Sequence, residues 1–266
     1  MIRRLTVVTV FAVAALVAGA VPAQASTALP ANTTVVTGTS DSYGFGTALP
    51  YWSAVAVRPG AGTDFDLRLS DAGTGTLLAS SLWGVGQTDV IAVNSNAGYR
   101  PLGSYLARVS QYSGTGSYAV SFFEKRLVMP VPTDPVGSTS TAWGINHSQT
   151  VTATQIYLQP GQGFRVYTGD SVRVFLAGST PGAPATAVRT RSQLENAYVV
   201  ADHVPAGNGA WCRVFVAPSA GWYSMILIWN SPWAPPPYNG GNAVFPQRYN
   251  PALGDTLTDC PVPQVP

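Results

Sequence analysis

The stretch Asp64–Ser81, DFDLRLSDAGTGTLLASS, decides the fold class of this 266-residue chain. Its first half alternates charged or polar residues with Phe65, Leu67 and Leu69, and its second half resumes as an apolar run after the turn-forming residues Asp71–Gly75. Alternation with a period of two, interrupted by Asp and Gly, is typical of two half-buried antiparallel strands joined by a turn. The stretch therefore predicts a β-hairpin.

Further short strands are predicted on both sides of this hairpin. Trp52–Arg58 (WSAVAVR) ends at Pro59-Gly60, a pair that forms turns because proline presets φ and glycine adopts a positive φ. Other alternating segments are Thr33–Thr37, Asp89–Asn94, Gly103–Ser110 and Ser117–Phe123. With the hairpin they make roughly seven short strands, which is typical of a β-sandwich or jelly roll.

The composition also favours an all-β protein. The chain holds 27 glycines and 22 prolines and only 10% of its residues are charged, which favours short strands joined by turns over helices. No segment after the first apolar run shows a helical period. The length suits one large domain or two ordinary ones.

The N-terminus predicts export. Arg3 and Arg4 precede the apolar segment Leu5–Val21, and Ala23-Gln24-Ala25 supplies the small residues that a signal peptidase accepts. We therefore interpret residues 1–25 as a cleaved signal peptide, with a secreted mature chain that starts near Ser26. A membrane anchor is the competing interpretation, but no charged stop-transfer flank follows, and no later apolar run is long enough to span a bilayer.

The mature charge bears on possible partners. Two of the fourteen basic residues lie in the signal segment, so that twelve basic residues remain against twelve acidic ones. A net charge of zero argues against binding of nucleic acid driven by overall charge.

Four motifs of the first unit resemble a known family. They are D-x-D-L-x-L at Asp64–Leu69, L-L-A-S-S at Leu77–Ser81, G-S-Y-x-x-x-V at Gly103–Val109 and G-S-Y-x-V at Gly116–Val120. In their order and spacing these motifs resemble the bacterial pre-peptidase C-terminal (PPC) domain, a small β-sandwich appended to many secreted proteases and other exported proteins. The resemblance is clearest over residues 33–125, about a third of the chain.

This resemblance implies a non-catalytic module that in some relatives binds protein substrates and in some binds calcium. The calcium ligands lie largely in an acidic linker before the sandwich, whereas the corresponding stretch here, Ser26–Tyr43, holds one acid, Asp41. Since calcium takes roughly six to eight oxygen ligands, no calcium site is expected there. Asp64 and Asp66 alternate along one strand and are interpreted as solvent-facing carboxylates rather than as a catalytic pair.

A second unit is predicted after a proline-rich linker. Glu124–Gly137 carries three prolines and breaks the strand pattern, which places a linker at 126–137 between a first sandwich, 26–125, and a second, 138–250. The second unit is interpreted as a divergent copy of the first, and a proline-rich tail, 251–266, follows it. Similar elements recur in similar order: Thr150–Leu158 before Pro160-Gly161, Ser171–Leu176 in the place of the hairpin, and Gly221–Trp229. The rival is one continuous sandwich or a single larger barrel.

The alignment of this second unit has two versions. Two segments could match the strand that begins at Gly103 in the first unit. Gly209–Trp211 lies at the same distance from the segment matched to the hairpin, whereas the sequence of Ala217–Tyr223 is more similar to that of the Gly103 strand. We prefer the latter, which makes Gln193–Asn208 an insertion. The strand Trp222–Trp229 is apolar on both faces and should be covered on both, by the tail or by the first unit.

Residues that could carry catalysis are few. The two histidines, His147 and His203, lie in no HExxH motif, and the sequence holds no G-x-S-x-G elbow and no phosphate-binding glycine loop. No metal and no cofactor is therefore predicted. Because serine is abundant, the alternative is a secreted hydrolase whose Ser/His/Asp site is assembled in space, with Asp202 and His203 as candidates.

The segment Trp229–Gly241 (WNSPWAPPPYNGG) is the candidate binding site. Trp229, Trp233 and Tyr238 are spaced by prolines and could form a rigid aromatic platform for a sugar ring or a peptide. The competing interpretation is that the loop folds back and its aromatic side chains cover the edge of a sandwich.

The two cysteines, Cys212 and Cys260, predict a disulfide, because an exported chain meets an oxidising environment. Such a bond would hold the tail against the second sandwich. Taken together, the sequence predicts a secreted, non-catalytic binding or accessory module whose partner is a protein or a polysaccharide; the oligomeric state stays open.

Overall fold

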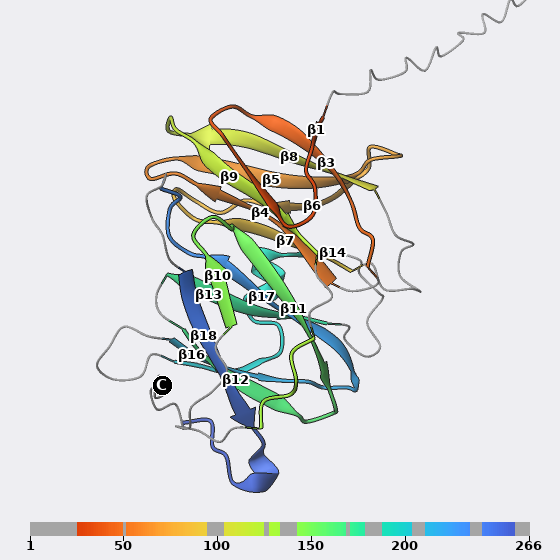
Figure 1. Ribbon diagram of the computed structural model, residues 1–266, viewed down its shortest axis with the longest axis vertical. Coiled ribbons are helices and arrows are strands. Elements are labelled where there is room, and N and C mark those ends of the chain that lie inside the picture. The colour runs from red at the N-terminus through yellow and green to blue at the C-terminus, as the bar shows by residue number, and fades with distance from the viewer. Residues whose placement is uncertain are drawn as a thin grey trace, which may run out of the picture.

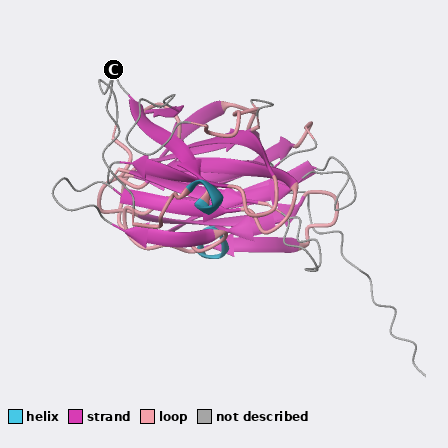
Figure 2. Ribbon diagram, turned by 90° about the horizontal axis from the view of Figure 1, so that it is seen from below, coloured by secondary structure: helices cyan, strands magenta, loops and turns pink. Residues whose placement is uncertain are grey.

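The computed structural model describes residues 26–49, 52–94, 104–124, 128–133, 143–168, 171–178, 188–203, 211–234 and 241–258. The predicted signal peptide, 1–25, and the end of the tail lie outside these ranges. The described chain is nearly all strand, with two short helical segments (Figure 2). This confirms the predicted all-β sandwich class. No helix in the described ranges has the length and apolarity needed to cross a membrane.

The strands form four sheets. Sheet I has the order β1-β3-β8-β5-β6, sheet II β14-β7-β4-β9-β2, sheet III β11-β17-β13 and sheet IV β10-β18-β12-β16-β15. The strands of the first half are β1 (Thr27–Ala28), β2 (Thr33–Thr37), β3 (Asp41–Gly46), β4 (Trp52–Pro59), β5 (Asp64–Asp71), β6 (Leu77–Ser81), β7 (Asp89–Asn94), β8 (Ser104–Ser113) and β9 (Tyr118–Phe123). Those of the second half are β10 (Trp143–Asn146), β11 (Val151–Leu158), β12 (Gly163–Thr168), β13 (Val172–Ala177), β14 (Val188–Thr190), β15 (Val199–His203), β16 (Trp211–Val216), β17 (Gly221–Trp229) and β18 (Gly241–Tyr249). The helical segments are α1 (Arg191–Leu194) and the 3-10 turn η1 (Pro251–Leu253).

The predicted hairpin is confirmed as β5 and β6. Phe65, Leu67 and Leu69 are fully buried, as the period of two requires. Asp71 closes the turn, since its Oδ1 accepts hydrogen bonds from the backbone N–H groups of residues 73 and 74. Gly75 supplies the positive φ, at 71°.

The four sheets stack in layers around three cores (Figure 1). The I–II core holds the inward side chains of sheets I and II, such as Phe65 and Ile91. The III–IV core likewise joins sheets III and IV. A II–III core packs the two inner sheets face to face, so both are covered on both sides. Five alanines contribute to this middle core, at positions 54, 56, 92, 153 and 177.

The strand β17 confirms the expectation of cover on both faces. Met225 and Leu227 lie in the III–IV core, whereas Ile226 and Ile228 lie in the II–III core. The cover on the second face is therefore sheet II of the first half. Trp222, at the start of the strand, is 39% exposed.

The halves of the chain are also joined by backbone pairing. The strand β14, from the second half, adds an edge to sheet II by pairing antiparallel with β7, Val188 opposite Val93. Within the predicted linker, Met129 is buried in the III–IV core and its N–H donates to the carbonyl of Gln155 at 2.6 Å. The division into two tandem sandwiches stays a prediction.

The preferred alignment of the second half is wrong. The strand that follows Pro160-Gly161 is β12, which was not predicted. Ser171–Leu176, the segment that had been matched to the hairpin of the first half, largely coincides with β13, which pairs with β17. The pairs β4–β9 and β5–β8 correspond to β11–β17 and β12–β16. The strand from Trp211 is thus the counterpart of β8. The sequence of β12 (GFRVYT) does alternate, with Phe164 and Val166 in the III–IV core and Arg165 between them, although Arg165 is also buried, at 1% exposure.

The two halves also share a turn. The N–H of Gly60 donates to the carbonyl of Ser117, and the N–H of Gly161 donates to the carbonyl of Ala217, both at 2.8 Å. The positive φ occurs at Gly62 in the first turn, rather than at Gly60 as predicted, and at Gly161 in the second. The repeated contact supports a shared strand arrangement in both halves.

Candidate ligand pocket beside the helix

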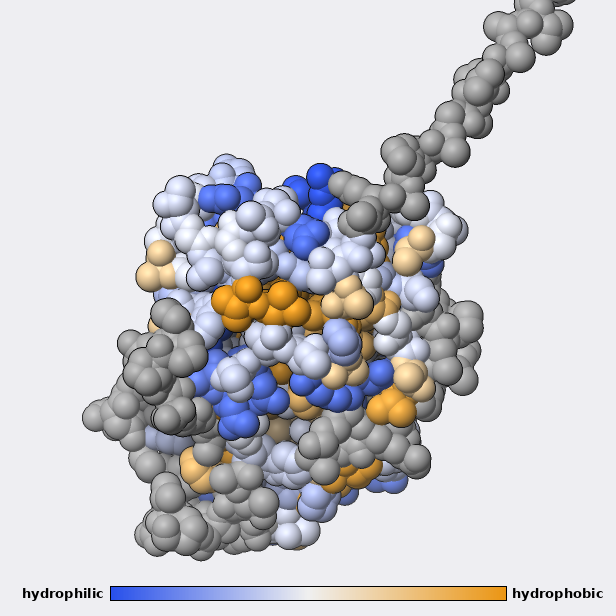
Figure 3. All heavy atoms as spheres, turned by 45° about the horizontal axis from the view of Figure 1, so that its top comes forward, coloured by the Kyte–Doolittle hydropathy of each residue, from blue (hydrophilic) through white to orange (hydrophobic). Residues whose placement is uncertain are grey.

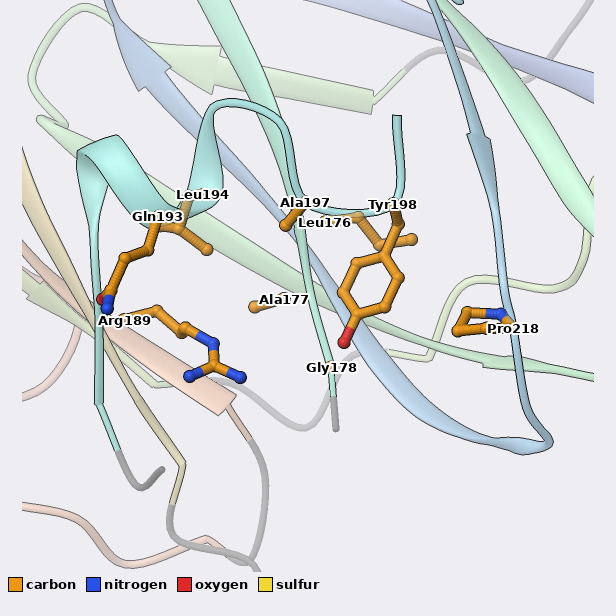
Figure 4. A pocket seen from close by; sticks show the side chains of 9 residues that line it. All are labelled: Leu176, Ala177, Gly178, Arg189, Gln193, Leu194, Ala197, Tyr198 and Pro218. Atoms are coloured by element: carbon orange, nitrogen blue, oxygen red, sulfur yellow. The ribbon is translucent and has the colours of Figure 1, made fainter. Parts of the chain in front are cut away.

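A pocket of about 420 Å³ opens beside α1 (Figure 4). The segments that form it are the end of β13, the strand β14, the helix, the turn that leads into β15 and the connection between β16 and β17. Its lining residues are Leu176, Ala177, Gly178, Arg189, Gln193, Leu194, Ala197, Tyr198 and Pro218. Figure 4 shows Arg189 and Gln193 on one side, Tyr198 and Pro218 on the other, and Ala177 between them.

The strand β14 directs Arg189 to the pocket. Val188 packs against the I–II core. Because successive side chains of a strand point to opposite faces, Arg189 projects toward sheet III, where Ala177 lies. The pocket therefore lies at the edge of the II–III core.

The helix α1 is short and firmly capped. Thr190 is its N-cap: its Oγ1 accepts from the N–H of Gln193 at 3.4 Å, and its own N–H donates to Gln193 Oε1 at 2.9 Å. This reciprocal capping box satisfies backbone groups that a single helical turn would leave open. Leu194 then inserts into the II–III core with no exposure and anchors the helix to the floor of the pocket.

Tyr198 forms one wall in an unusual backbone conformation. Its φ is +62°, a left-handed value that costs energy for a bulky residue and is often found at functional sites. Its carbonyl accepts from the N–H of Val216 at 3.0 Å, and its ring meets that of Tyr223 edge to face at 5.3 Å. Gly178 completes this wall: a Cβ there would lie 2.2 Å from the Tyr223 ring.

Arg191 holds the helix to both halves of the chain. It is 2% exposed, and its guanidinium donates to the carbonyl of Thr88 and, at 2.8 Å, to Asn230 Oδ1. It also pairs with Glu195 at 3.3 Å and lies 3.9 Å over the ring of Trp83. The helix beside the pocket is therefore fixed rather than loosely attached.

A buried acid, Asp89, lies near the Arg191 guanidinium. Asp89 is fully buried, and its Oδ1 accepts from Ser81 Oγ at 2.6 Å and from the N–H of Trp83 at 3.1 Å. Within the described part of the chain its Oδ2 has no hydrogen-bond partner. Burial raises the pKa of Asp89 to about 8, against the lowering effect of these hydrogen bonds.

The predicted aromatic platform is not assembled at Trp229. That side chain is 2% exposed; its Nε1 donates to the carbonyl of Asn146 at 2.9 Å and its ring stacks on His147 at 4.3 Å. Trp229 is thus a core residue, because β17 is apolar on both faces. Trp233 is half-buried, and its N–H donates to the carbonyl of Pro59 at 2.6 Å. Tyr238 lies outside the described residues.

An exposed aromatic pair occurs elsewhere. Tyr157 and Trp222 are opposite one another on β11 and β17, with ring centroids 5.3 Å apart and exposures of 40% and 39%. The sequence could not reveal this pair, because the two residues meet only once the strand register is known.

Two of the acids considered for catalysis, Asp202 and Asp66, are paired with arginines. Asp202 accepts from Arg213 at 2.6 Å, and His203 follows it in β15. Asp66 pairs with Arg68 at 3.7 Å, whereas Asp64 is 6% exposed, so the prediction of a solvent-facing carboxylate is wrong there. Burial raises the pKa of Asp64, and nearby Asp66 adds to this. Within the described ranges, no three His, Cys, Asp or Glu side chains gather in a way that could hold a metal.

The predicted disulfide falls partly outside the described residues. Cys212 is fully buried in β16 and is not a free thiol, whereas Cys260 lies beyond the described ranges. The pairing of Cys212 with Cys260 therefore stays a prediction.

The pocket residues Arg189, Gln193 and Tyr198 were not predicted. One signal was present: Thr190 followed three residues later by Gln193 is the pattern of a capping box, and it marks a helix start. Comparison with known proteins adds no further assignment, since no family model matches the chain and no curated protein matches it significantly.

Proposed function

We propose that the protein is an exported, non-catalytic β-sandwich module that binds a protein or polysaccharide partner, with the pocket beside α1 as its contact site. The pocket carries the proposal. It has an apolar floor that includes Ala177 and Leu194 of the II–III core, a small number of polar groups at its rim, and a wall, Tyr198, that packs against the III–IV core. These are the usual properties of a preformed binding site.

The sequence supports export and a non-catalytic role. The signal-like segment at residues 1–25 supports export, and the resemblance of residues 33–125 to the PPC family supports a non-catalytic role. The corresponding pairings β4–β9 and β11–β17 support a repeat of that unit in the second half. In an oxidising environment a Cys212–Cys260 disulfide would secure the tail.

The surface in Figure 3 supports a local contact site. On that face the strongly apolar residues form small separate groups among polar ones. A pocket is therefore a better candidate for specific recognition than this broad surface.

A pull-down tests the proposal. The mature chain from residue 26 is incubated with bacterial cell-wall material, chitin, cellulose and collagen, beside the variants Arg189→Gln and Arg108→Gln. Arg108 is an exposed residue of β8 in sheet I, so its variant controls for the lost charge. We expect one material to retain the wild-type chain and the Arg108→Gln variant but to retain Arg189→Gln weakly.

Two results would oppose the proposal. Retention that survives Arg189→Gln but is lost in Trp222→Ala would move the contact to the exposed aromatic pair. Turnover of a generic ester or peptide that is lost in His203→Ala would support the hydrolase alternative.

A further inference from the structure

We infer that the pocket beside α1 binds an apolar group that carries a carboxylate, as the C-terminal residue of a protein chain presents it. In this arrangement the Arg189 guanidinium binds the carboxylate and the floor receives the last side chain. The inference rests on the proposed function and makes the partner a protein rather than a polysaccharide.

Arg189 supplies the charge recognition. Its side chain extends toward the middle of the pocket (Figure 4). A guanidinium presents parallel N–H donors that match the two oxygens of a carboxylate. Arg189 is the only cationic residue among the nine that line the pocket, which suits a monoanion better than a phosphate dianion.

The acid that follows α1 is paired with two other arginines. Glu195, just after α1, pairs with Arg191 at 3.3 Å and with Arg213 at 3.4 Å. These contacts hold its carboxylate within the framework of the second half. An incoming carboxylate can thus be recognised without displacing Glu195 from its two arginines.

The floor and walls favour an apolar side chain. Leu176, Ala177, Leu194 and Pro218 present only hydrocarbon, and Tyr198 adds a ring. Burial of such surface by an apolar ligand side chain favours binding through the hydrophobic effect. A volume of about 420 Å³ lies toward the small end of ligand pockets and suits one terminal residue.

The same lining opposes a sugar. A saccharide carries many hydroxyl groups, and each one that is buried without a partner costs free energy. Among the described residues that line the pocket, only Arg189, Gln193 and Tyr198 have polar side-chain atoms. Gln193 Oε1 already accepts from the N–H of Thr190 at 2.9 Å. The described lining therefore offers few side-chain donors and acceptors to a ring with several hydroxyl groups.

Nuclear magnetic resonance titration of the ¹⁵N-labelled mature chain tests the inference. The probes are an acetylated tetrapeptide that ends in phenylalanine with a free carboxylate, the same peptide as its C-terminal amide, 3-phenylpropionate and chitotriose. We expect the free-carboxylate peptide to shift the backbone amides of 191–198 and to bind at least about tenfold more tightly than the amide. The Arg189→Gln variant should lose the same factor, and Arg108→Gln should lose none.

Each alternative result is decisive. Equal binding of the acid and the amide would overturn the role of the carboxylate. If 3-phenylpropionate bound tightly and the peptide did not, the ligand would be a small free acid, and the inferred binding of a protein C-terminus would be wrong. Shifts of the amides of residues 191–198 caused by chitotriose would overturn the inference but not the proposed function. If no probe shifted these amides, the inference would be wrong, and the pull-down would test the proposed function separately. Because the acid and the amide are compared on the wild-type chain, the test holds even if Arg189→Gln folds poorly.

Discussion

Arg191 lies over the indole ring of Trp83, with its guanidinium carbon 3.9 Å from the ring centroid. One residue belongs to the helix of the second half and the other to the loop after β6 in the first half. Together with the pairing of β14 with β7, this contact makes the helix beside the pocket depend on both halves.

The first prediction concerns the contacts of Arg191. Replacement Arg191→Ala removes the hydrogen bonds that the guanidinium donates to the carbonyl of buried Thr88 and to the side chain of half-buried Asn230. We expect a loss of about 2–4 kcal/mol in the free energy of unfolding, measured by urea denaturation. Arg108→Ala should change it by less than about 0.5 kcal/mol. If Arg191→Ala lowered the free energy of unfolding by less than about 0.5 kcal/mol as well, the contacts of Arg191 would not be stabilising.

The second prediction concerns pH. Asp89 has a pKa of about 8 in the folded protein and an ordinary pKa of 3.8 when unfolded. Between these values the folded state binds the extra proton, so stability is highest near the lower value and falls as pH rises.

We expect the free energy of unfolding to decrease from pH 5 to pH 8 with a slope approaching about 1.4 kcal/mol per pH unit from this group. Asp66 and Arg191 act on Asp89 in opposite directions, since the former raises and the latter lowers its pKa. The variant Asp89→Asn keeps the shape and should flatten the slope. A slope that is unchanged in this variant would assign the pH dependence to other groups.

The third prediction concerns the cysteines. In the chain produced in an oxidising compartment, a Cys212–Cys260 disulfide should appear as a single tryptic pair that separates on reduction. Closing a loop of this length stabilises the fold by about 4 kcal/mol in the chain-entropy account. Two alkylated thiols, found by mass spectrometry without reductant, would contradict it.

The fourth prediction concerns cooperativity. Because the II–III core and β14 join both halves, calorimetry of the mature chain should show one unfolding transition rather than two. Proteolysis confined to residues 124–137, followed by separation of two stable fragments, would favour independent units.

Sequence patterns predicted the strands well where one face was buried. Phe65, Leu67 and Leu69 show the period of two because β5 has a polar outer face. The strand β12 has the same alternation, with Phe164 and Val166 in the III–IV core and Arg165 between them, but it was not recognised, and the preferred alignment was wrong as a result.

The site was harder to predict because it depends on tertiary contacts. Trp229 resembled an exposed aromatic residue in a proline-rich segment, but sheet packing buries it between His147 and Arg58. Arg189 reaches the pocket only because β14 crosses to the first-half sheet, which no local pattern indicates.

Amide hydrogen exchange with the retained partner tests the central claim most directly. The mature chain is compared with and without the partner captured in the pull-down, and exchange is followed by peptide. The account predicts slower exchange at residues 188–198, around α1 and Tyr198. Unchanged exchange there, with slowing at Tyr157 and Trp222 instead, would contradict it.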